Sequence, residues 1–349
     1  MLKFIQNEKL SGHTTISLGG IAKKFISCAD ENAIIEVLKY SITESEKIQI
    51  ISGGSNIIFQ DKGYNGIVMK INNKGIKSIT NGDDEILTVK AGESWDDFVK
   101  HCISEGYQGI ECMSGIPGSV GATPVQNVGA YGQEVKDVIA SLKAINRETL
   151  ENIVISKEEC NFRYRQSRFK NTDRDKFIIT EVTFVLNKNK SPEIKYPELE
   201  KYIRENIEYK ASESIREKLE IIRKAVIALR KKKSMVIDEI DPNSKSCGSF
   251  FTNPVITEKE FNELKSRVTD FPFYKTEDGY KIPAAWLIEN SGFRKGYRLN
   301  GAGISENHSL AIINCGGKTA DILKLAMDIE LSVLNKFGIR LEKEPVIVD

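Results

Sequence analysis

Residues 109–132 read GIECMSGIPGSVGATPVQNVGAYG, and the rest of the chain is organised around this stretch. Six of its residues are glycine, two are proline, and Glu111 is its one charged residue. No helical or strand periodicity lasts through it, so it does not cover a core. Glycine lets the backbone approach a ligand closely, and successive free N–H groups form an anion-binding concavity. The stretch therefore predicts a loop against a large phosphate-bearing ligand, in preference to a tight structural connector.

A second glycine turn lies upstream, at Ser52-Gly53-Gly54-Ser55-Asn56, between two short apolar runs. The pattern predicts either strand, turn, strand or strand, turn, helix. The turn offers backbone N–H groups and small hydroxyls to a pyrophosphate. Alone it is more typical of a simple hairpin, but the two glycine stretches together favour ligand binding.

Length and composition narrow the class of protein. A chain of 349 residues predicts two or three domains. A formal net charge of +1 gives no bulk attraction for nucleic acid or an anionic membrane, and we expect neither partner. No apolar run has membrane-spanning length and no signal peptide is evident at the N-terminus. Scattered cysteines without a Cys-x-x-Cys pair, and three histidines in no ligand spacing, predict a reducing cytoplasm and no metal site.

Hydrophobic periodicity predicts alternating helices and strands. Asp30 is a candidate cap for one helix, a Ser214–Glu217 capping box begins another, and Thr319 and Gly338 bound a last one. The basic run 230–233 suits the C-terminal end of the second helix better than a nucleic-acid patch. Strands are expected at residues 66–71, 86–92, 138–144, 152–155, 177–186 and 339–349.

Three polar spots could carry chemistry. Residues 162–169, Phe-Arg-Tyr-Arg-Gln-Ser-Arg-Phe, interleave cations with aromatics and suit a carboxylate or phosphate, although a solvated edge strand explains them equally well. Ser249 sits in Gly-Ser-Phe-Phe without a Gly-x-Ser-x-Gly elbow, which excludes a hydrolase nucleophile but allows a proton donor. Glu344 lies near the C-terminus, where a glutamate is usually exposed and inert.

These motifs together resemble the UDP-N-acetylenolpyruvoylglucosamine reductase (MurB) family, in its longer-chain type I subgroup, over nearly the whole chain. The resemblance rests on Gly-Gly-Ser-Asn, Ile-Pro-Gly-Ser-Val-Gly, Gln-Asn-Val-Gly-Ala-Tyr-Gly, Phe-Arg-Tyr-Arg-Gln-Ser, Gly-Ser-Phe-Phe-x-Asn-Pro and Ala-Ala-Trp-Leu-Ile-Glu. It implies an α+β fold with a two-subdomain FAD-binding part of the vanillyl-alcohol-oxidase (PCMH) type and a C-terminal α/β substrate-binding domain. The implied boundaries are 1–77 with 338–349, 78–232, and 233–337.

The resemblance also implies an activity. Family members reduce UDP-N-acetylglucosamine enolpyruvate to UDP-N-acetylmuramate for peptidoglycan synthesis, with FAD as cofactor and NADPH as reductant. The protein supplies geometry and charge for the flavin chemistry. We expect a cytoplasmic monomer. The alternatives are an oxidase or dehydrogenase of the same flavin fold, and a non-catalytic nucleotide-sugar binding protein.

Carried over residue by residue, the resemblance assigns Arg165, Ser249 and Glu344 to catalysis, with Glu342 as an outside candidate because the proline of the last motif is displaced. It assigns Tyr164, Tyr196, Lys233 and Asn253 to the substrate, although the segment between Lys233 and Ser249 is longer than in compact members. The expected FAD-binding residues are Ser52, Gly53, Gly54, Ser55, Asn56, Ile116, Pro117, Gly118, Ser119, Gly121, Ala122, Gln126, Asn127, Gly129, Ala130 and Tyr131.

Overall fold

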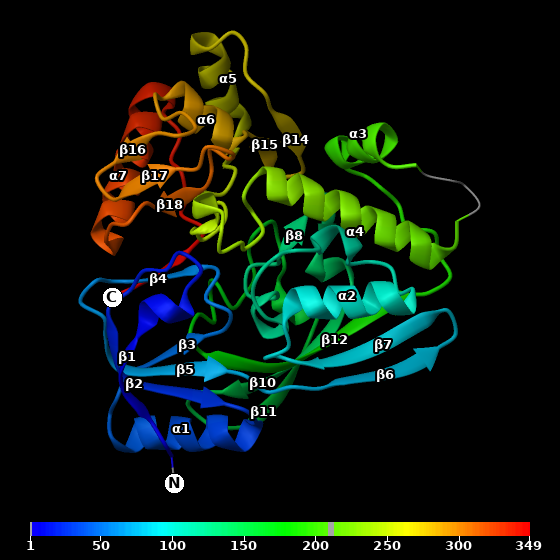
Figure 1. Ribbon diagram of the computed structural model, residues 1–349, viewed down its shortest axis with the longest axis vertical. Helices are drawn as coiled ribbons and strands as arrows, with labels where there is room; N and C mark the ends of the chain where they lie inside the picture. The colour runs from blue at the N-terminus through cyan, green and yellow to red at the C-terminus, as the bar shows by residue number, and fades with distance from the viewer. Residues whose placement is uncertain (1, 209–212) are drawn as a thin grey trace. The chain divides into compact units, whose positions relative to one another are not determined.

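The computed structural model describes residues 2–208 and 213–349, and the chain forms two compact units (Figure 1). Unit 1 comprises residues 1–7, 23–53 and 65–232, and unit 2 comprises residues 8–22, 54–64 and 233–349. The boundary after Gly53 falls inside the upstream glycine turn, so that turn contributes residues to both units. The three-part division expected from the sequence stays a prediction.

A four-stranded sheet with one helix on its face forms the first layer of unit 1 (Figure 1). Helix α1 (Glu31–Thr43) begins where expected, because the Asp30 side chain accepts a hydrogen bond of 2.8 Å from the N–H of Ala33. Its apolar side chains pack on the sheet around Ile67 and Met69. The strand order is β1 (Ile5–Lys9), β2 (Ile21–Cys28), β5 (Tyr64–Ile71), β3 (Ile48–Ile51).

An antiparallel five-stranded sheet forms the second layer of unit 1 and carries helix α2 (Trp95–Glu105). Trp95, Phe98 and Phe184 join the helix to the sheet, and the two phenylalanine rings lie 5.1 Å apart. The glycine-rich stretch begins directly after α2, so this core supports it. The strand order is β11 (Asn152–Ser156), β10 (Ile139–Asn146), β12 (Phe177–Asn187), β7 (Asp84–Lys90), β6 (Ile76–Asn81).

Helix α4 (Ile215–Lys232) packs under the shorter helix α3 (Pro197–Asn206) and against the glycine-rich stretch at Cys112. The predicted capping box is confirmed, since the N–H of Ser214 donates to Glu217 at 2.7 Å and the N–H of Glu217 donates back at 3.3 Å. The basic run closes the helix, as its macrodipole favours.

Unit 2 surrounds helix α7 (Thr319–Phe337), whose buried face packs on a small antiparallel sheet and on α6 (Ala284–Asn290). Within the described residues, no helix is both long and apolar enough to cross a membrane. The remaining elements are α5 (Glu258–Arg267), the sheet β13 (Val255–Ile256), β15 (Gly279–Lys281), β14 (Tyr274–Thr276), the sheet β16 (Arg298–Leu299), β17 (Ala302–Ile304), β18 (Ile312–Asn314), and the parallel pair β4 (Ile57–Phe59), β19 (Val346–Val348).

The N-terminus of α7 is capped by a residue that the sequence did not indicate. Thr319, the expected cap, is the first helical residue, and its hydroxyl donates to the carbonyl of Phe59 at 2.8 Å. The carboxylate of Asp61 instead accepts from the N–H groups of Thr319 and Ala320 at 2.8 and 3.0 Å. The prediction of Thr319 as the cap was wrong, because the carboxylate of Asp61, which is distant in sequence, binds the free N–H groups at the positive end of the helix.

Candidate active site

The Ser52-Gly53 part of the upstream turn meets the glycine-rich stretch in unit 1. A Cβ atom on Gly53 would lie 2.7 Å from the Cα of Gly118, a distance that side-chain atoms do not adopt. Beside this contact the hydroxyls of Ser52 and Ser119 hydrogen-bond each other. Bare backbone and two hydroxyls therefore face the same place, which is the surface that a pyrophosphate requires. The two stretches singled out in the sequence are brought together here.

The rest of the 116–122 loop is fastened to the sheet core of unit 1. The N–H of Val120 donates to the carbonyl of Glu93, and that of Gly121 donates to the carbonyl of Ala91, each at 2.9 Å. A Cβ on Gly121 would lie 2.4 Å from the Cβ of Ala91. Glycine at 121 is therefore required by packing, whatever contact its backbone makes with a ligand.

A clamp that the sequence did not indicate holds the first half of the glycine-rich stretch. Arg223 of α4 makes a bidentate ion pair with Asp96 of α2, with N–O distances of 2.7 and 2.8 Å. Asp96 also accepts from the N–H of Gly115 at 2.5 Å. Burial alone would raise the pKa of Asp96, but the Arg223 and Gly115 hydrogen bonds outweigh it and lower that pKa. Neither partner belongs to a motif, so only the fold reveals the pair.

Glu111 is an acid buried beneath the same stretch. Its carboxyl oxygens accept from the N–H of Gly109 at 2.7 Å and from the amide of Gln133 at 2.9 Å. Gln133 in turn accepts from the N–H of Cys112 at 2.8 Å. Burial raises the pKa of Glu111 above its ordinary value. The acid therefore ties the two ends of the loop together inside the protein.

The end of the glycine-rich stretch is a tight hairpin, β8 (Gly129–Ala130) and β9 (Gln133–Glu134). Tyr131 and Gly132 at its tip both have positive φ, 48° and 87°, as a type I′ turn requires. Burial raises the pKa of Tyr131 to about 12. Its ring meets that of Tyr196 edge to face at 5.3 Å, so the structure brings together two residues expected to bind different ligands.

Arg165 stands at the tip of a second turn, in which Arg163 and Gln166 exchange backbone hydrogen bonds of 3.0 and 3.1 Å. Its φ is +54°, a left-handed conformation that costs a residue other than glycine roughly 1–2 kcal/mol. The guanidinium donates to the carbonyl of Gly129 at 2.8 Å and lies 5.2 Å from the centre of the Tyr164 ring. The expected catalytic arginine is thus held in a strained turn. It contacts the glycine-rich stretch 109–132, which is expected to bind FAD and is called the cofactor loop below.

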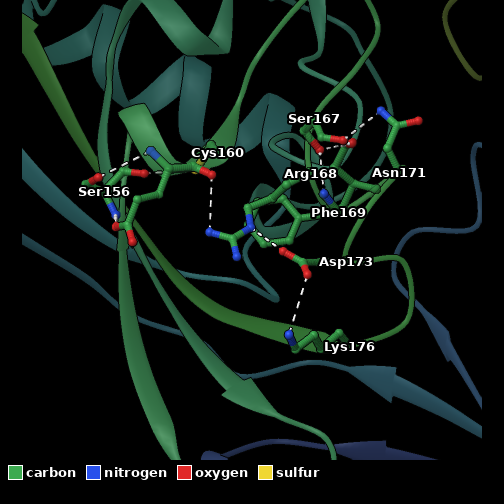
Figure 2. A network of polar contacts seen from close by, with 10 residues as sticks. Ser156, Cys160, Ser167, Arg168, Phe169, Asn171, Asp173 and Lys176 are labelled. Atoms are coloured by element: carbon green, nitrogen blue, oxygen red, sulfur yellow. Dashed lines mark hydrogen bonds and ion pairs between the residues drawn. The ribbon is translucent and has the colours of Figure 1, made fainter.

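The chain after this turn is organised by a polar network, shown in Figure 2. Arg168 forms an ion pair with Asp173 and donates to the carbonyl of Glu159 at 3.2 Å. The amide of Asn171 donates to Gln166 at 2.7 Å and to the carbonyl of Ser167 at 3.0 Å. These contacts fix the C-terminal side of the Arg165 turn.

In unit 2, the segments that carry Ser249 and Glu344 lie side by side. Phe251 and Lys343 form an antiparallel bridge, and the N–H of Glu344 donates to the carbonyl of Phe250 at 2.9 Å. Asn56, from the upstream glycine turn, donates to the carbonyl of Glu344 at 3.3 Å. The phenylalanines of Gly-Ser-Phe-Phe are buried and anchor the serine beside them. The tertiary structure therefore places one expected catalytic residue next to the other.

The exposure of the two candidate glutamates differs. Glu344 is half-buried and precedes β19, whereas Glu342 is exposed. Asn253 accepts from the N–H of Ala284 at 2.9 Å, at the start of α6, so part of its amide positions that helix. Lys233 is the first residue of unit 2 after α4 and is half-buried.

The expected site residues divide between the units. Unit 1 holds Arg165, Tyr164 and Tyr196 together with the expected FAD-binding residues from 116 to 131 and Ser52 and Gly53. Unit 2 holds Ser249, Glu344, Glu342, Lys233 and Asn253 together with Gly54, Ser55 and Asn56. No cluster of metal-ligating side chains occurs in residues 2–208 and 213–349.

Comparisons with known proteins identify two domain families in the chain. The model of the FAD binding domain matches residues 22–149, and that of the UDP-N-acetylenolpyruvoylglucosamine reductase C-terminal domain matches residues 241–348. The reductase of Thermobifida fusca is 40% identical, with 99% of this chain and 98% of that relative covered. The reductase of Salinispora arenicola is 38% identical, with coverage of 97% and 94%.

A solved structure supports the same fold. The reductase (MurB) from Thermus caldophilus superposes with a TM-score of 0.66 at 21% identity and covers 100% of this chain and 99% of that one. The predicted α+β class, with a FAD-binding part and a separate C-terminal domain, is confirmed. The chain belongs to the UDP-N-acetylenolpyruvoylglucosamine reductase family.

Proposed function

We propose that Arg165, Ser249 and Glu344 carry the chemistry of the family reaction in this chain. That reaction is the NADPH-dependent reduction of UDP-N-acetylglucosamine enolpyruvate to UDP-N-acetylmuramate, a step of peptidoglycan synthesis, by a FAD-dependent oxidoreductase. The observation that carries the residue assignment is the bridge at Phe251 and Lys343, which sets the Ser249 and Glu344 segments side by side.

The glycine turns of unit 1 fit the cofactor. Ser52 and Ser119 supply hydroxyls, and glycine at 53 lets the two turns approach closely, because a Cβ there would lie 2.7 Å from the Cα of Gly118. When bound, FAD supplies the hydride chemistry, accepting hydride from NADPH and delivering it to the vinyl carbon of the substrate. We propose that the remaining cofactor contacts come from the 116–131 stretch and from the 54–56 part of the upstream turn.

The charged residues prepare the substrate for a nucleophilic hydride. An enol ether accepts hydride only when its carboxylate is held and polarised, because negative charge builds there in the transition state. Arg165 and Glu344 fill this role in the proposal, and Arg165 already lies in a strained, fixed turn. A positioned guanidinium is suited to a carboxylate because it presents paired N–H donors.

The Ser249 hydroxyl completes the reaction in this proposal. Its Oγ donates a proton to the other former alkene carbon, and solvent returns a proton to the serine. A serine hydroxyl is a weak acid, so this transfer requires the strongly basic carbanion-like intermediate. Tyr164, Tyr196, Lys233 and Asn253 remain proposed substrate contacts, with Tyr196 (41% exposed) beside the half-buried ring of Tyr131.

The visible spectrum of the purified protein tests the cofactor assignment. We expect a yellow protein whose flavin absorbance NADPH removes. A colourless protein that binds nucleotide sugar would favour the non-catalytic alternative instead.

Stopped-flow measurement of each half-reaction tests the serine. We predict that Ser249→Ala leaves flavin reduction by NADPH intact but slows reoxidation by substrate by roughly 10²–10⁴-fold, as expected for loss of a proton donor. The control is Ser266→Ala, which removes an exposed hydroxyl that hydrogen-bonds within α5. Reoxidation of reduced Ser249→Ala at the wild-type rate would remove the assigned role.

We further propose that the chain acts as a monomer in the cytoplasm, with the substrate and NADPH as its partners. The support is chemical, because NADPH and UDP-sugars are small ligands and the near-neutral net charge gives no general attraction for nucleic acid or anionic lipid. Light scattering after size-exclusion chromatography checks the oligomeric state.

A further inference from the structure

We propose that Asn127 is a positioning residue that fixes the Arg165 turn to the cofactor loop. Asn127 is one of the residues expected to contact FAD, and its side-chain amide is hydrogen-bonded within the protein. The inference rests on the role proposed above for Arg165. In it, the hydrogen bonds of Asn127 keep the Arg165 guanidinium in place as long as the cofactor loop is ordered.

The hydrogen bonds of Asn127 are made inside unit 1. Its Nδ2 donates to Oε2 of Glu134 and to the backbone carbonyl of Arg163, each at 3.0 Å. Its Oδ1 accepts from the N–H of Lys136 at 3.1 Å. The side chain is fully buried and the backbone φ is +48°, a conformation that asparagine tolerates better than most residues. Both amide protons and the carbonyl oxygen are therefore already engaged.

One of these bonds reaches the base of the Arg165 turn. Arg163 exchanges backbone bonds with Gln166, and its carbonyl also accepts from Asn127. On the other side of the turn, the Ser167 hydroxyl donates to the carbonyl of Val125 at 2.5 Å. Residues 125 and 127 of the cofactor loop thus hold both flanks of the turn, while the Arg165 guanidinium contacts the loop at residue 129.

These ties matter because the turn does not hold its shape by local preference. Arg165 adopts positive φ without being glycine, asparagine or aspartate, so surrounding contacts must stabilise it. The network in Figure 2 fixes the chain after Ser167 and ties Arg168 back to the carbonyls of Glu159 and Cys160, whereas Asn127 holds the carbonyl of Arg163 inside the turn itself. Loss of the Asn127 donor should let the guanidinium move while the rest of the loop stays folded.

The neighbouring glutamate makes a selective test available. Asn127→Asp keeps the size, the tolerance of positive φ and the acceptor for Lys136, but places a carboxylate against two acceptors. Adding Glu134→Gln restores a donor between positions 127 and 134, because the glutamine amide at 134 can donate to the aspartate carboxylate at 127. The double variant therefore restores the bond across the hairpin and leaves the carbonyl of Arg163 without its donor.

We expect Asn127→Asp to lower both the melting temperature and the retention of FAD. The double variant should recover both properties, yet reoxidation of its flavin by substrate should stay roughly 10–100-fold slow, as for a misplaced catalytic group. Hydrogen exchange at the amides of Arg163 and Gln166 supplies a readout independent of turnover, and it should be faster than wild type in both variants. If the single variant does not fold, the reoxidation rate and hydrogen exchange of the double variant still test the positioning role of Asn127.

The controls separate this inference from the assignment of Arg165. Asn189→Asp makes the same change opposite a carboxylate, that of Asp83, at an exposed site, and should leave reoxidation at the wild-type rate. Arg165→Lys run in parallel should slow reoxidation, and if it does not, the role proposed for Arg165 fails. If it does and the double variant reoxidises at the wild-type rate with unchanged exchange in the turn, Asn127 has no positioning role.

Discussion

At the scale of single residues, the shape of the site depends on glycines, whose lack of a Cβ atom lets neighbouring segments pack closely. Gly53 and Gly121 both exclude a Cβ, but for different reasons: Gly53 meets the backbone of another glycine turn, whereas Gly121 meets the side chain of Ala91 in the core. A glycine-rich sequence thus mixes glycines that let two loops approach each other with glycines that pack against the core. Only the neighbours in space distinguish the two classes.

Gly53→Ala tests the first class. The added methyl group would lie 2.7 Å from the Cα of Gly118, so the two turns must move apart. We expect weaker FAD retention and a loss of stability of about 1–3 kcal/mol, typical of overpacking. The control is Gly12→Ala, where a Cβ has no neighbour within 4 Å. FAD titration and urea unfolding report the two quantities, and equal behaviour of both variants would contradict the steric account.

At the scale of elements, distant segments hold the loops in shape. The clamp of Arg223 on Asp96 joins α4 to α2 and to the N–H of Gly115, across 127 residues of sequence. Asp61 likewise caps α7 from another segment of unit 2. Helices here supply fixed ends and charges, and the loops derive their geometry from them.

Asp96→Asn tests the clamp through its pH dependence. The pKa of Asp96 lies below the value of 3.8 for the free side chain, so the ion pair stabilises the fold fully above pH 3.8 and less as the pH falls through the lower folded value. We expect the variant to lose about 1–3 kcal/mol at neutral pH, and this difference from wild type to shrink in acid. Urea unfolding over a pH series measures it.

A surface pair provides the comparison. Lys324 and Asp328 form an exposed i,i+4 pair on α7, and Asp328→Asn should cost only about 0.3–0.5 kcal/mol. A difference for Asp96→Asn that grew as the pH fell would contradict the sign of its pKa shift.

At the scale of the whole molecule, the burial of cysteines reports whether the fold is intact. All six cysteines are free thiols; five are buried and Cys315 is exposed. Burial raises the pKa of Cys28, Cys160 and Cys247 to about 12, which leaves almost no thiolate at ordinary pH.

We therefore expect one fast-reacting thiol in the native protein at pH 8, and six after denaturation. A thiol-reactive chromophore counts both, and Cys315→Ser should abolish the fast phase. Two or more fast thiols in the native protein would show that the core is more open than described.

Much of the fold could be predicted where the signal is local. The Asp30 cap, the Ser214–Glu217 box and the Gly338 C-cap (φ 73°) occur where the sequence places them, because each acts within one helical turn. The upstream glycine turn lies between β3 and β4, the first of its two predicted arrangements. The family, its cofactor and its reaction were also indicated, since they depend on motifs that are contiguous in the chain.

The sequence alone thus determined helices α1, α4 and α7, the local caps at Asp30, Ser214 and Gly338, the two glycine turns and the family. Tertiary structure alone decided that Asp61 caps α7, that Asp96 and Arg223 hold the loop at Gly115, and that the amide of Asn127 faces Arg163 rather than outward. The physical reason is the sequence distance over which each interaction acts. Propensity, capping and periodicity act over a few residues, whereas a hydrogen bond between distant segments exists only after folding has closed the intervening loop and removed the competing water.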